Sequence, residues 1–139
     1  MFYELATMTL PFGTAAAAAQ NVQAYCTAPE AEGELLACWF TDIGVLNQMI
    51  VLRGFADLAD LQAERERTQQ SASPFGNGEI FQTLEQHSYQ GFPWMKPVRP
   101  SAESGITGPV YEIRTYGIKP GGVQPTIDLW EQYLSLIHI

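Results

Sequence analysis

Two eleven-residue segments of this chain share one pattern, and this internal repeat restricts the possible folds more than any other feature. Residues 3–13 read YELATMTLPFG and residues 111–121 read YEIRTYGIKPG. Identical residues recur at an offset of 108, at Tyr3 and Tyr111, Glu4 and Glu112, Thr7 and Thr115, and Gly13 and Gly121. Each copy passes from a strand pattern through a glycine-marked turn into a helix pattern, so the repeat predicts a duplicated unit.

The first copy predicts four strands and two helices in the order βαββαβ. Strand patterns occupy residues 2–10, 34–42, 46–53 and 79–90, and helix patterns occupy residues 15–27 and 58–70. Thr14 and Asp57 stand where a side chain is expected to cap each helix. This order is typical of a ferredoxin-like α+β fold of the dimeric α/β-barrel type, followed here by the first strand and helix of a second copy.

The repeat also predicts the domain boundaries. The chain divides into a first repeat at residues 1–95, a proline-containing linker at 96–108, the start of a truncated second repeat at 109–133, and a tail at 134–139. In the second repeat we expect a strand at 110–118 and a helix from 122 to 133. The tail reads LSLIHI, which resembles one reading frame of a sequencing adapter, and it is expected to be non-native.

A ferredoxin-like sheet carries both of its helices on one face and leaves the other face bare. A second sheet layer can bury that face, since two sheets pack face to face around a shared core. The expected partner is therefore the protein itself, either as its second repeat or as a homodimer, with another protein as a further possible partner.

The residues also resemble a known family. The segment VYEIRTYGIKPG at 110–121 resembles the opening of NIPSNAP-family repeats. The stretches at 40–67 and 88–100 resemble the central hairpin with its second helix and the end of a first repeat. The resemblance implies the dimeric α/β-barrel fold, a cytoplasmic location in bacteria and a mitochondrial one in eukaryotes. It implies no settled reaction for bacterial members.

Charge and composition exclude several function classes. The formal net charge is −8, from 7 basic and 15 acidic residues, which argues against binding nucleic acid or anionic lipid. No apolar run approaches the roughly 20 residues of a membrane-spanning helix, so membrane insertion is not expected. Cys26 and Cys38 show neither zinc-ligand nor CxxC spacing and are expected to be reduced, buried thiols.

Strand alternation places Glu112, Arg114 and Tyr116 on one face of the second copy's strand. Glu4 has the equivalent place in the first copy. If this face points between two sheets, Glu4, Glu112 and Arg114 would line a central cavity, where a carboxylate with a raised pKa could act as a general base. The alternatives are a structural Glu–Arg pair that aligns the sheets and a solvated face.

His87 shares a face of the last strand with Tyr89. A lone histidine is most often a satisfied or exposed side chain, and haem binding through His87 is a lesser alternative. No metal and no other cofactor are expected. The charged run Glu64–Arg67 is most simply a solvated helix face.

Two functions remain open at this point. The first is a non-catalytic interaction or scaffold module that assembles through its sheet face. The second is a small-molecule-binding barrel, or a cofactor-free enzyme, with its pocket between two sheets. The first is favoured because no set of residues requires a catalytic explanation.

Overall fold

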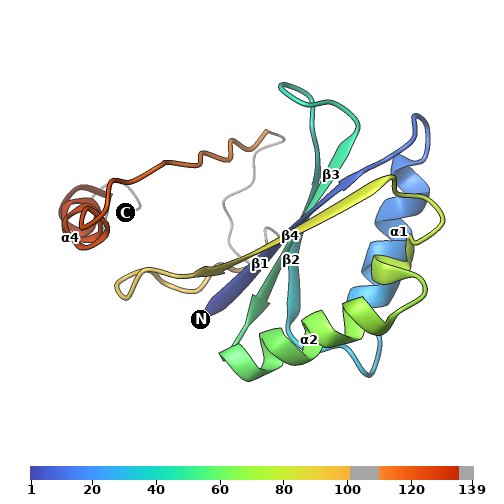
Figure 1. Cartoon of the computed structure of the whole chain (residues 1–139), viewed down its shortest axis with the longest axis horizontal. Helices are drawn as coiled ribbons and strands as arrows, with labels where there is room; N and C mark the ends of the chain where they lie inside the picture. Colours follow the sequence, from blue (N-terminus) through green and yellow to red (C-terminus); the bar gives the residue numbers. More distant parts are fainter. Residues whose placement is uncertain (101–109, 135–139) are drawn as a thin grey trace.

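In the computed structural model, which describes residues 1–100 and 110–134, a four-stranded antiparallel sheet organises the first part of the chain (Figure 1). Its strands are β1 (Phe2–Thr9), β2 (Glu34–Phe40), β3 (Gln48–Phe55) and β4 (Thr83–Gln90). They lie in the order β2-β3-β1-β4, with every neighbouring pair antiparallel. This order, with one helix after β1 and one after β3, confirms the ferredoxin-like βαββαβ fold.

Helices α1 (Ala15–Cys26) and α2 (Leu58–Gln70) cover the same face of the sheet (Figure 1). Asp57 caps α2 as expected, because its carboxylate accepts hydrogen bonds from the backbone N–H groups of Ala59 and Asp60 at 2.8 and 3.0 Å. The cap expected from Thr14 is wrong. Its hydroxyl donates to the carbonyl of Pro11 at 2.8 Å, and its backbone is helical rather than extended, so the side chain does not reach the first turn of α1.

The last strand starts later than the sequence predicts. Residues 74–82 form a short 3₁₀ turn, η1 (Pro74–Gly76), and an irregular segment before β4 begins at Thr83. Asn77 holds this segment in place. Its carbonyl accepts the N–H groups of Ile80 and Phe81, and its side-chain amide donates to the carbonyl of Ala18 in α1 at 3.0 Å.

The hydrophobic core lies between the sheet and the two helices. It contains β1 and β3 side chains that alternate with outward-facing ones, together with side chains from α1 and the η1 turn: Ala6, Met8, Met49, Val51, Ala18, Val22, Cys26 and Phe75. Because strand side chains alternate between faces, the remaining positions of each strand point away from the helices. The sheet therefore has one filled face and one open face.

Residues 110–118, where a strand was expected, run as an extended segment that forms no ladder with any described strand. A strand needs a neighbour, and residues 110–118 pair with neither of the two edge strands, β2 and β4. The helix expected next is confirmed as α4 (Val123–Leu134), which lies apart from α1 and α2 (Figure 1). Residues 101–109 of the linker region and 135–139 of the tail lie outside the described residues.

Candidate functional site

The open sheet face is the part of the protein best suited to contact another molecule. Register pairs Leu5 with Leu52 on one side and with His87 on the other, and Trp39 with Ile50. Alternate residues of the strands form this face: Tyr3, Leu5, Thr7, Ala37, Trp39, Ile50, Leu52, Glu85, His87 and Tyr89, with Thr9, Glu34, Gln48 and Thr83 at strand ends. The apolar side chains lie mainly in the middle of this face, on β1, β2 and β3, and they point away from the helices.

Two later segments of the same chain lie over part of this face. The backbone N–H of Val98 donates to the Tyr3 hydroxyl oxygen at 3.0 Å. Further along, the ring of Tyr111 lies 5.3 Å from the ring of Trp39. Residues 92–98 and 110–115 therefore cover part of the open sheet face. Its side chains from β1, β2 and β3 are half-buried, whereas Glu85, His87 and Tyr89 of β4 are exposed.

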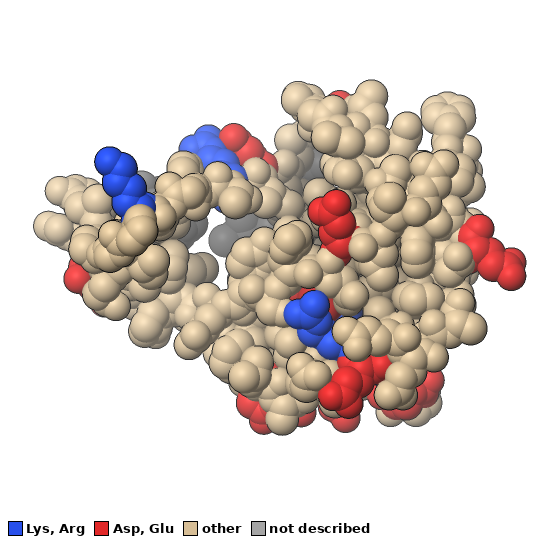
Figure 2. All heavy atoms as spheres, viewed as in Figure 1, with Lys and Arg blue, Asp and Glu red and all other residues tan. Residues whose placement is uncertain are grey.

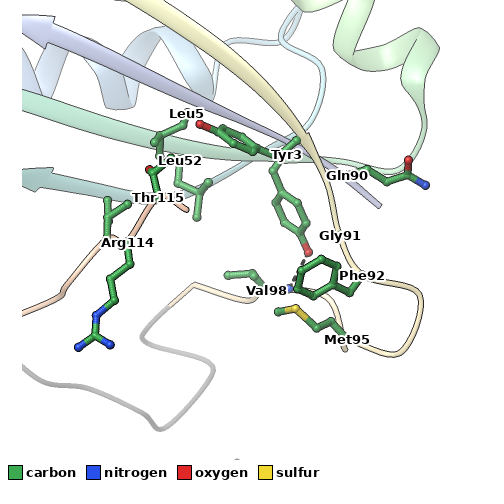
Figure 3. A pocket seen from close by; sticks show the side chains of 12 residues that line it. Tyr3, Leu5, Leu52, Gln90, Gly91, Phe92, Met95, Val98, Arg114 and Thr115 are labelled. Carbon is green, nitrogen blue, oxygen red and sulfur yellow. Dashed lines mark hydrogen bonds between the residues drawn. The ribbon is translucent and has the colours of Figure 1, made fainter. Parts of the chain in front are cut away.

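Between the sheet and these two segments lies a groove of about 300 Å³ (Figure 3). Its floor is Leu5 and Leu52, and the Tyr3 ring stands between the sheet and the turn that follows β4. Phe92, Met95 and Val98 form the opposite wall. The surfaces that meet in the groove are almost entirely apolar, so it favours apolar contact rather than the binding of an ion.

Four charged residues, Glu4, Arg53, Glu64 and Arg67, form a cluster on the helix side of the sheet. Arg53 of β3 forms ion pairs with Glu4 of β1 and with Glu64 of α2, and all three side chains are fully buried. Glu64 also accepts hydrogen bonds from Arg67 at 2.6 and 2.8 Å. Gln86 of β4 donates to the second oxygen of Glu4 at 3.0 Å. Two carboxylates and two guanidiniums thus balance each other, and among the four only Arg67, with 20% of its side chain exposed, reaches solvent.

The shifted pKa values of Glu64 and Arg53 favour the charged forms of both side chains. Burial raises the pKa of Glu64, but the hydrogen bond from Arg67, the charge of Arg53 and the N–H of Glu32 outweigh it and leave the pKa below its ordinary value. Burial lowers the pKa of Arg53, but the charge and hydrogen bond of Glu4 raise it by more. The pKa is therefore above its ordinary value and the guanidinium stays charged. The solvated face expected for Glu64 is therefore wrong, because the carboxylate faces inward and joins α2 to the sheet.

The cavity expected to hold Glu4, Glu112 and Arg114 together is not formed. Alternation places Glu4 with Ala6 on the helix side of β1, where it is fully buried. Glu112 and Arg114 are exposed and pair with each other, with nitrogen–oxygen distances of 2.8 and 2.7 Å. The stem of Arg114 borders the groove, but its guanidinium points away from the sheet (Figure 3).

The other two predicted site residues are placed separately. Tyr116 is exposed and lies edge-on to Trp130 of α4, with ring centroids 5.7 Å apart. His87 lies on the open sheet face with its Nε2 4.0 Å from the Glu85 carboxylate, and more than half of its side chain is exposed. A ligand-binding role for these residues, and haem binding by His87, stay predictions.

Neither cysteine is part of a site in the described chain. Both thiols are free, and burial raises the pKa of Cys26 to about 11 and also raises the pKa of Cys38. Within residues 1–100 and 110–134, no group of three or more His, Cys, Asp or Glu side chains is arranged to hold a metal ion. None of the helices described there is long and apolar enough to cross a membrane.

Sequence reasoning missed both the groove and the buried cluster. The groove depends on Leu5 and Leu52, which are opposite each other only because of the β1–β3 register. The cluster depends on Glu4 and Arg53, which are also register partners. A signal was present for the cluster, since a strand glutamate and a strand arginine on otherwise apolar faces need partners.

Comparison with known proteins identifies the family. The NIPSNAP family model matches residues 3–89, which is more than half of the chain. The chain belongs to the NIPSNAP family. A search among curated proteins finds no match.

Solved structures of NIPSNAP proteins have the same fold. An uncharacterized NIPSNAP domain protein from Burkholderia xenovorans is 18% identical with a TM-score of 0.52, and the match covers 70% of this chain and all of that one. A NIPSNAP family protein from Agrobacterium tumefaciens is 21% identical with a TM-score of 0.53, covering 70% and 98%. A second protein from that bacterium is 23% identical with a TM-score of 0.52, covering 68% and 96%. At these identities the likeness concerns the fold alone.

Proposed function

We propose that this NIPSNAP protein is a non-catalytic interaction module that assembles through its open sheet face. The observation that carries the proposal is the composition of that face. Apolar side chains from β1, β2 and β3 meet there, including Leu5, Trp39, Ile50 and Leu52, and only part of them is covered by the chain itself. An apolar sheet face is stable when another layer packs on it.

The distribution of charge supports the same assignment. Acidic side chains gather at the lower edge of the molecule over α2 (Figure 2). Among the strand residues that form the open sheet face, the titratable side chains apart from tyrosines are Glu34, Glu85 and His87, which lie on the two edge strands β2 and β4. The chain has a net charge of −8, but few of its carboxylates lie on this face. Two such faces can therefore pack together with little repulsion between carboxylates.

The partner layer is a second copy of the fold, from the same chain or from another. The residues already lying over the open sheet face support this, since they are the start of the repeated pattern. Tyr111, Ile113 and Thr115 face the sheet, and they match Tyr3, Leu5 and Thr7 at the offset of 108. The same side of the repeated segment would then line the space between two layers.

The proposal is tested by sedimentation of the whole chain over a range of concentrations. We expect a monomer–dimer equilibrium, and Ile50→Glu in the open sheet face should shift it to monomer because it buries a charge in an apolar contact. Leu58→Glu is the matched control, since Leu58 is an exposed leucine on α2. A strictly monomeric chain, or equal effects of the two substitutions, would contradict assembly through this face.

A further inference from the structure

We propose that the groove beside Tyr3 is a binding site for a small, uncharged aromatic molecule about the size of indole. The inference goes beyond the proposed function, because the groove exists within a single chain and does not require assembly. Small-molecule binding was the second function that the sequence left open. The groove is the proposed site for it, and a neutral aromatic molecule is the proposed ligand.

The first argument is the equivalence of two tyrosines. Tyr3 and Tyr111 match at the offset of 108, and both face the space between the sheet and the segment above it. The indole ring of Trp39 packs against Tyr111, with ring centroids 5.3 Å apart and planes tilted by 43°. Within residues 1–100 and 110–134, no aromatic ring packs in this way on Tyr3. Because Tyr3 lines the groove, an indole bound there would contact its ring.

The second argument is the size and lining of the groove. Its volume of about 300 Å³ is at the lower end of the range for small-molecule sites, which suits a fused two-ring molecule. Tyr3 offers an aromatic ring on which a further ring packs favourably. Phe92 already contacts Trp94 and Trp130, and it borders the groove with the part of its ring that these contacts leave open. The thioether of Met95 adds a polarisable contact to a ring, and Leu5 and Leu52 form a flat apolar floor.

The third argument is charge. The one cationic side chain among the lining residues is Arg114, and its guanidinium points away from the sheet and is held by Glu112 through two hydrogen bonds (Figure 3). A carboxylate ligand in the groove would therefore lose its hydration without gaining an ion pair. The Tyr3 hydroxyl accepts from Val98, and its oxygen has a second lone pair that can accept from the N–H of a neutral indole.

The test is a titration of 5-fluoroindole with the whole chain, followed by fluorine NMR line width and with the assembly state of each sample recorded by sedimentation. We expect saturable broadening with the native chain. Met95→Ala and Phe92→Ala should each weaken binding by about tenfold, because each removes a contact to the ring. Both residues lie in the turn after β4, outside the strands, so the sheet is expected to form in both variants.

His87→Ala is the matched control, since His87 is on the open sheet face but does not line the groove. It should bind the probe like the native chain. The proposal is overturned if the probe shows no saturable binding, or if Met95→Ala and Phe92→Ala bind it as tightly as the native chain. Tighter binding of indole-3-acetate than of 5-fluoroindole would overturn the preference for an uncharged ligand. Failure of this site leaves assembly through the sheet face unaffected, because the sedimentation of Ile50→Glu tests that separately.

Discussion

Residues 3–13 and residues 111–121 share a sequence pattern but occupy opposite environments. The first begins in β1, which has neighbours on both sides and one face in the core. The second runs as an exposed extended segment without a ladder. Glu4 is fully buried and pairs across the sheet with Arg53, whereas its counterpart Glu112 is exposed and pairs with Arg114, two residues along.

The difference teaches that a strand pattern gives a segment its two faces but not its neighbours. In both segments the Tyr3 or Tyr111 side points between the layers, so the alternation is preserved. The contact between each segment and the helix that follows it also occurs at matching positions. Tyr116 meets Trp130 of α4, and these residues match Met8 and Val22 of the core at the offset of 108. What the second segment lacks, among the described residues, is a strand on either side.

Amide hydrogen exchange should show the largest contrast between the two segments. Amides of β1 are bonded in ladders and should exchange only through global opening, which slows them by at least about a thousandfold in a domain of ordinary stability. Amides of residues 112–118 should exchange at nearly the rate of an unstructured peptide. Comparable protection of both segments, measured by mass spectrometry or NMR, would show that residues 112–118 find strand neighbours in solution.

The matched substitutions Glu4→Gln and Glu112→Gln should separate a buried ion pair from an exposed one. Glu4→Gln leaves the buried Arg53 short of one partner and should lower the free energy of unfolding by about 3–5 kcal/mol. Glu112→Gln should leave the urea midpoint unchanged within error, because water and salt already screen that pair. Equal midpoints for the two variants would mean that the Glu4 site is hydrated.

The helices that follow the two segments give a smaller contrast. Val22 of α1 is fully buried, and Val22→Ala should cost about 1.5–2 kcal/mol of unfolding free energy for the two methyl groups removed. Leu129 of α4 is 52% exposed, so Leu129→Ala should change the value by no more than about 0.5 kcal/mol. A large cost at Leu129, measured by urea unfolding, would reveal a second core around α4.

The smallest expected effect is a dependence on acid pH in the first repeat. The pKa of Glu64 is lowered in the folded chain, so its contribution to stability is present above the unfolded-state pKa of about 4.3 and is lost as pH falls through the lower folded-state pKa. The stability gap between the native chain and Glu64→Gln should therefore narrow as the pH falls below about 5.

The matched comparison for this pH series is again in the second segment. The hydrogen bond from Arg114 also lowers the pKa of Glu112, but that carboxylate is exposed and supports no packing. The native chain and Glu112→Gln should therefore differ little in stability at every pH. A gap that stays constant for Glu64→Gln across the series would show that its carboxylate does not titrate with folding.

Periodicity and turn residues were enough to predict the elements of the first repeat. The helix predicted at 58–70 and its cap Asp57 agree with α2, because local hydrogen bonds and apolar spacing decide both. The start of β4 was misplaced, because the Asn77 turn depends on contacts to Ala18 in α1 far away in sequence. Alternation divided the side chains of β1 between two faces. It did not show which of the two faces packs against the helices.

The sequence by itself determined the order of strands and helices, the alternation along each strand and the resemblance to the NIPSNAP family, since these follow from short-range patterns. Only the tertiary structure decided that Glu4 and Glu64 join Arg53 in a buried cluster, and that Tyr3 and Leu52 border a groove. Those outcomes depend on register and on which face is covered. A shift of one residue in register exchanges the two faces, so they are properties of paired strands and not of any segment alone.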